Sequence, residues 1–162
     1  DYWALQEAEG GIIVGEIIHF VDLLSQLHQS PASRVSAKAN LKAVNKGSYH
    51  ITLYFENGSV GEITYLMGSK IGGDKEKIEI LFDHDRVTIE GFRKVISSKK
   101  KNISNSRQMD MGREKLFGDI LYEFARGKNV QDIKGLVASH LAVFAIKESI
   151  QSGGDVVVER VS

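Results

Sequence analysis

The stretch YHITLYFENGSVGEITYLM, residues 49–67, decides the fold of this chain. Apolar and polar residues alternate through its first half, which is the two-residue period of a strand with one buried face. Asn57-Gly58 follows, and the alternation resumes over residues 60–67. Asn-Gly between two alternating runs is the strongest short-range signal for a β-hairpin. The sequence therefore predicts an antiparallel strand pair here.

Strand signals also lie on both sides of this hairpin. Residues 34–44 alternate with small inward side chains, which predicts that another element packs closely against them. Residues 77–82 and 86–90 flank a turn at Asp83-His84-Asp85, and residues 156–158 could add an edge strand. Because most of these strands are joined by short turns, we expect an α+β fold with a largely antiparallel open sheet and helices packed on one face.

Three segments have helical patterns, and the first is GGIIVGEIIHFVDLL at residues 10–24. At about 100° per residue its apolar residues form one stripe. That stripe consists of Ile13, Ile17, Phe20, Leu24 and Leu27. Residues 112–126 and 133–151 predict two later helices, and the polar segment 97–106 predicts a loop.

Helices can cover only one face of so long a sheet, so we expect the other face to mediate dimerisation. That face would carry Tyr49, Ile51, Leu53 and Phe55, or their neighbours in the strand.

Glu16 and His19 are candidate functional residues on the first helix, because the pattern puts them about one turn apart near a glycine-rich start. Gly10, Gly11 and Gly15 would allow a ligand to approach the backbone closely. The alternative is that His19 is an ordinary boundary histidine, Asp22 a solvated helix residue and the glycines a turn.

Bulk composition bounds the class of protein. The 162 residues suffice for one compact domain over residues 1–162. The 21 basic residues cancel the 21 acidic ones, so no nucleic-acid or membrane partner is indicated. The chain has no cysteine, which excludes disulfides and fits a cytoplasmic location. It also begins at Asp1 without a methionine, so we expect it to be part of a longer polypeptide.

Common catalytic and cofactor motifs are absent from the sequence. It contains no GxGxxG or GKS/GKT phosphate loop, no HExxH and no GxSxG. Each of the other four histidines has an ordinary structural interpretation, and we expect no metal site. These are His28, His50, His84 and His140. Trp3 is either a ligand-stacking residue or an anchored aromatic of an N-terminal arm.

The combination of motifs resembles one family. The glycine pair, HFxDLL on a helix, the FxNGSxGxIxY hairpin and the IEIxF strand pair occur in the order found in the C-terminal domain of the glucose-fructose oxidoreductase, inositol dehydrogenase and rhizopine catabolism (Gfo/Idh/MocA) family. The similarity covers nearly the whole chain and is greatest to the subgroup with GEGCHFIDLL in this helix, where a DHW segment resembles Asp1-Tyr2-Trp3.

The resemblance implies an N-terminal Rossmann domain, absent from this chain, that binds NAD or NADP and carries the lysine of an EKP motif. It also implies a substrate-binding and dimerisation domain here, with a sugar or polyol substrate. In the family motif GGxxxDxGxHxxD, His19 and Asp22 match the histidine and the last aspartate. Gly15 replaces the catalytic aspartate and Ile17 the usual glycine, although the adjacent Glu16 could supply a carboxylate.

His19 would be the catalytic base or its hydrogen-bonding assistant, with Glu16 and Trp3 as substrate-binding residues. The fragment alone would be inactive. A noncatalytic dimerisation or assembly module that has lost the full site is the main alternative, and a self-standing protein that binds small polar ligands is a third.

Overall fold

A computed structural model describes residues 10–40, 47–67, 76–99, 104–105, 112–128 and 132–160. The chain forms two compact units, residues 1–69 with 131–162, and residues 70–130. Each unit contains a four-stranded antiparallel sheet, so the strands expected to form one sheet form two. The α+β class and the antiparallel pairing are confirmed.

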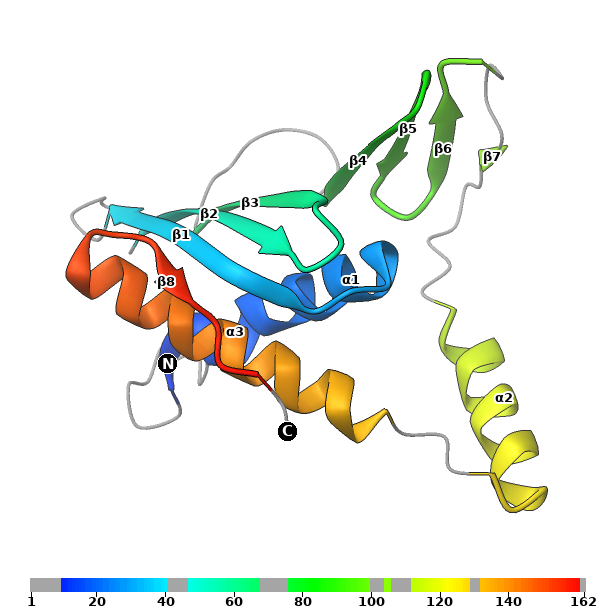
Figure 1. Ribbon diagram of the computed structural model, residues 1–162. Coiled ribbons are helices and arrows are strands. Elements are labelled where there is room, and N and C mark those ends of the chain that lie inside the picture. Colours follow the sequence, from blue (N-terminus) through cyan, green and yellow to red (C-terminus); the bar gives the residue numbers. More distant parts are fainter. Residues whose placement is uncertain are drawn as a thin grey trace. The chain divides into compact units, whose positions relative to one another are not determined.

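The sheet of the first unit has the strand order β3-β2-β1-β8 (Figure 1). Its strands are β1 (Ala32–Asn40), β2 (Ser48–Phe55), β3 (Val60–Leu66) and β8 (Val156–Val157). The predicted hairpin joins β2 to β3, and Gly58 in its turn has a φ of 85°, which favours glycine. The predicted edge strand is also confirmed, because β8 pairs with β1.

Two helices cover one face of this sheet, α1 (Ile18–His28) and α3 (Ile133–Ser152) (Figure 1). The side chains between them and the sheet form the core of the unit. Its fully enclosed residues include Ile17, Val21, Val35, Ile51, Leu53, Val143 and Ile146. Among the described residues, no helix has the length and apolar character needed to cross a membrane.

The alternating residues of β2 are divided between the two faces of the sheet. Tyr49, Ile51, Leu53 and Phe55 are all buried under the helices. The open face therefore carries their neighbours in the strand, including His50, Thr52 and Tyr54. Of the two predicted compositions for the uncovered face, only the neighbouring, more polar set is compatible with the structure.

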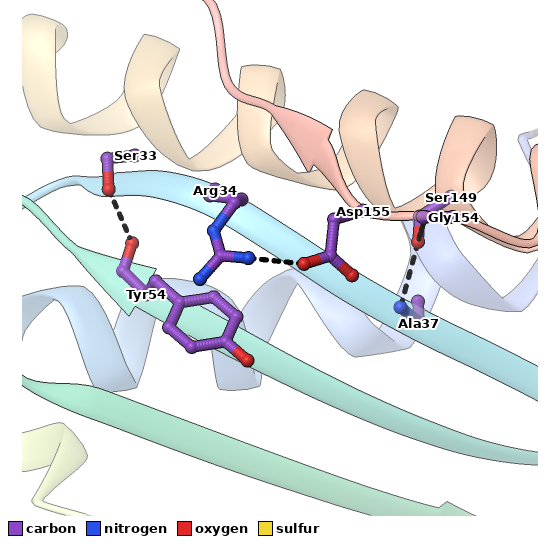
Figure 2. Close-up of polar contacts among 7 residues, drawn as sticks. All are labelled: Ser33, Arg34, Ala37, Tyr54, Ser149, Gly154 and Asp155. Atoms are coloured by element: carbon purple, nitrogen blue, oxygen red, sulfur yellow. Dashed lines mark hydrogen bonds and ion pairs between the residues drawn. The ribbon is translucent and has the colours of Figure 1, made fainter.

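Small side chains let α3 approach β1 closely, as the sequence predicted. Ala37 of β1 is buried, and so are Ala142 and Ala145 of α3. The hydroxyl of Ser149, itself 0% exposed, accepts the backbone N–H of Ala37 at 2.8 Å and donates to the carbonyl of Gly154 at 2.6 Å (Figure 2). Ser149 thus satisfies a strand N–H that would otherwise be buried without a partner.

On the opposite side of β1, polar side chains join β1 to the residues that follow α3. Arg34 forms an ion pair with Asp155 and lies 3.8 Å from the centre of the Tyr54 ring (Figure 2). Lys38 donates to the carbonyl of Gly153, which caps α3 with a φ of 76°. These contacts fix the end of α3 against the sheet.

A π-helical segment, η3 (Ile13–Ile17), precedes α1 and changes the helical phase that uniform spacing predicted. The innermost residues around α1 are Ile17 and Val21, and Leu24 packs partly buried against the core. Leu27, expected on the apolar stripe, is 45% exposed, which corrects that prediction. The imidazole of His28 takes the core-facing position and stacks on Phe55, with ring centroids 4.4 Å apart.

The second unit contains β4 (Lys77–Phe82), β5 (Asp85–Glu90), β6 (Lys94–Ser97), β7 (Ser104–Asn105) and α2 (Arg113–Ala125). The hairpin β4–β5 was predicted. The polar segment 97–106 was predicted as a loop, but Ser97 is the last residue of β6, and Ser104 and Asn105 pair with β6. The prediction was wrong for these three residues.

We predict that Ser149→Ala destabilises the protein by about 1–3 kcal/mol, because the N–H of Ala37 loses its partner in a buried position. Urea unfolding would measure the loss. Gln151→Ala, at an exposed position two residues further along α3, is the matched control and should change stability by less than about 0.5 kcal/mol. Equal effects of the two variants would contradict this role of Ser149.

Burial of its ring lowers the pKa of His28 from 6.5. The unfolded chain therefore takes up a proton from His28 at a higher pH than the folded chain does. The contribution of neutral His28 to the free energy of unfolding is complete above the pKa of His28 in the unfolded chain. It is lost as the pH falls through the pKa of His28 in the folded chain. We expect the urea midpoint to fall between about pH 7.5 and pH 5. The fall should be smaller in His28→Leu and unchanged in the control His140→Gln.

Candidate functional site

The predicted site lies on η3 and the first turns of α1. Gly10 and Gly11 have φ angles of 86° and 70°, in the region that favours glycine. A Cβ atom at Gly10 would lie 2.7 Å from the Cβ of Val14, so a larger residue does not fit there. The glycine pair is therefore explained by the tight start of the helix.

His19 is exposed on the first turn of α1. Its phase explains this exposure, because Ile17 and Val21 on either side of it point into the core. His19 thus lies on the side of α1 that faces away from the sheet. Glu16 is half-buried on the π-helical segment, and Trp3 lies outside the described residues.

Asp22 is not simply a solvated helix residue. It is half-buried, and its carboxylate accepts a hydrogen bond of 3.2 Å from the hydroxyl of Ser139, which is 2% exposed on α3. A hydrogen bond to a carboxylate is among the stronger ones in proteins, so this contact helps to fix α1 against α3. No local sequence pattern marks this contact, because the two residues are 117 positions apart.

The turn between β4 and β5 holds the other cluster singled out from the sequence. Asp85 accepts hydrogen bonds from the hydroxyls of Ser98 and Ser97, which hold the pKa of its carboxyl at about 2. His84 is exposed beside it, in a shallow hollow that also involves Phe82 and Arg86. Within the described ranges, no three His, Cys, Asp or Glu residues lie close enough to hold a metal ion. The hydrogen bonds of Asp85 join the start of β5 to Ser97 and Ser98 at the end of β6.

Comparison with known proteins shows which solved structures share this fold. No family model and no curated protein matches the chain. Among solved structures, levoglucosan dehydrogenase in its apo form matches with a TM-score of 0.79 and 15% identity, over 100% of this chain and 55% of that one. The same enzyme in complex with NADH and L-sorbose matches with a TM-score of 0.74 and 16% identity, over 93% of this chain and 51% of that one.

The myo-inositol 2-dehydrogenase from Lactobacillus plantarum also matches, with a TM-score of 0.68 and 16% identity, over 93% of this chain and 49% of that one. The chain has a Gfo/Idh/MocA-type fold. It spans about half the length of these dehydrogenases. The resemblance read from the motifs is thus confirmed for the fold.

The two residues of α1 that match the family motif, His19 and Asp22, have different surroundings in this fold. His19 is exposed, whereas Asp22 is held by α3. Ile17, which stands where the family motif has glycine, is 0% exposed. The larger side chain of Ile17 is therefore accommodated in the core and does not cover the exposed side of α1.

Proposed function

We propose that residues 1–162 are the substrate-binding and dimerisation domain of a nicotinamide-dependent oxidoreductase that acts on a hydroxyl or carbonyl group of a sugar or cyclitol. The observation that supports this most strongly is the match of the whole chain to about half of levoglucosan dehydrogenase. The remainder of the enzyme would be an N-terminal Rossmann domain that binds NAD or NADP. This chain would be inactive without it.

The sequence and the exposure of His19 support the assignment of dinucleotide binding to the other domain. The sequence has no glycine-rich phosphate loop, so the phosphates of a dinucleotide would be held by the other domain. His19 is exposed on the side of α1 away from the sheet, where a group bound by a neighbouring domain can reach it. A bound nicotinamide would accept the hydride that leaves the carbinol carbon.

His19 is the proposed catalytic base. As the hydride departs and the carbonyl forms, the hydroxyl proton must leave, and an imidazole can accept it near neutral pH. Glu16 and Trp3 are the proposed substrate-binding residues. Asp22 is a positioning residue in this scheme, since its bond to Ser139 fixes the helix that carries His19 one turn earlier.

A noncatalytic dimerisation or assembly module is the second candidate function. Gly15 supports it, because this residue stands where the family motif has its catalytic aspartate. Such a module would keep the fold and the open sheet face but would not turn over a substrate. Nicotinamide-linked activity of the complete polypeptide separates the two functions.

We predict that His19→Ala in the complete polypeptide lowers kcat by roughly 100-fold or more, because proton transfer contributes that much when a positioned side chain performs it. The assay would follow reduction of NAD and of NADP at the nicotinamide absorbance, with a panel of sugars and cyclitols. His84→Ala is the matched control, since that histidine lies on the β4–β5 turn of the other unit. An unchanged rate in His19→Ala would reject the role of base.

The open face of the first sheet is the proposed surface for self-association. Its central row, Ser36, Thr52 and Glu62, is polar, and Val60 and Leu66 are about half exposed along β3. A partner surface could pair with such a mixture through both hydrogen bonds and apolar contacts.

We predict that light scattering gives a mass of at least twice 17.9 kDa at high protein concentration. Thr52→Arg should shift the protein toward the monomer, because it adds a charge at the centre of the face. Gln26→Arg, on the exposed side of α1, should leave the mass unchanged. A monomer at every concentration would refute self-association.

A further inference from the structure

Helix α3 has a second apolar surface on the side opposite the one it buries. Its buried residues include Ala142, Val143 and Ile146, which face the sheet and α1. About half a turn away, four large apolar side chains are 40–58% exposed. They are Ile133, Leu136, Val137 and Phe144, and they form what we call the outer stripe.

This arrangement is unusual for a helix that packs on a sheet. Such helices commonly carry polar residues on the side away from the core. Scattered exposed apolar residues need no explanation, but a row at helical spacing is a feature of surfaces that bind another protein. Leu136 lies three residues, about one turn, before Ser139 and is therefore near the contact with α1.

The outer stripe and His19 lie on the same side of the helical layer. The hydrogen bond between Asp22 and Ser139 holds α1 against α3, and both helices cover the same face of the sheet (Figure 1). His19 lies opposite the core side of α1, and the outer stripe lies opposite the core side of α3. One surface that covers the layer from outside would contact both.

We propose that the outer stripe is the docking surface for the dinucleotide-binding domain of the enzyme. This inference rests on the proposed function and adds the surface by which the two halves meet. The occupant follows from one observation and from the proposed role of His19. The similar dehydrogenases contain about one further length of this chain, and the nicotinamide has to reach His19 on this side of the layer. Apolar contact along α3 would hold the two domains in that geometry.

The absence of cysteine from the 162 residues allows a direct test by labelling. Val137→Cys and Phe144→Cys would be made singly, in this chain and in the complete polypeptide that its gene encodes. Glu159→Cys, at an exposed position after β8, is the matched control. Reaction with a maleimide, followed by peptide mass spectrometry, gives the rate at each introduced cysteine.

We expect both stripe cysteines to react roughly tenfold or more slowly in the complete polypeptide than in the 162-residue chain, because docking excludes water and reagent. The rate at Glu159→Cys should stay the same. Equal rates in the two proteins would overturn the proposal. Protection of the stripe already in the 162-residue chain would also overturn it, since a second copy would then be the occupant.

Fluorescence titration of the complete polypeptide with NADH separates this proposal from the proposed function. Protected stripe cysteines without NADH binding would leave the docking of a second domain in place and refute the nicotinamide-dependent activity. Binding of NADH with fully reactive stripe cysteines would refute the docking surface and leave the activity in place.

Discussion

The close contact between α3 and β1 is the constraint on which the first unit depends. Ala37, Ala142 and Ala145 keep the helix and strand near one another, and the hydroxyl of Ser149 accepts the N–H of Ala37 in the space between them. A larger side chain at any of these positions would push the helix away. Loss of the hydroxyl would leave a strand N–H buried without a partner.

The orientation of α1 follows from this contact. Once α3 is fixed on the sheet, Ser139 binds Asp22, and Ile17 and Val21 fill the space beside Ile51 and Leu53. The side of α1 that carries His19 then has to face outward. The same packing turns the outer stripe of α3 outward, so a candidate catalytic group and an apolar surface share one side. The packing of α1 and α3 on the sheet thus places His19 and the outer stripe on the same side.

Much of the fold could be predicted because its signals are local. The β2–β3 hairpin is marked by Asn57-Gly58, and the end of α3 by Gly153, whose φ of 76° is readily reached by glycine. The alternation in β1 identified its buried side and the small residues that admit α3. Identity and spacing within a few residues suffice for such features.

Other features depend on contacts between distant segments. The division of the strands into two sheets and the pairing of Ser104–Asn105 with Lys94–Val95 leave no local pattern. Leu27 was misplaced because η3 alters the phase that a uniform helix would have. The contact of Asp22 with Ser139 was missed because the two residues are far apart in the sequence. The exposure of His19 depends on the core packing around Ile17 and Val21.

The structure of the complete polypeptide with NADH and a bound polyol tests the central claim most directly. The imidazole of His19 should lie within hydrogen-bond reach, about 3 Å, of the substrate hydroxyl whose carbon faces the nicotinamide. A nicotinamide bound on the other side of the sheet, with His19 in contact with solvent alone, would contradict it.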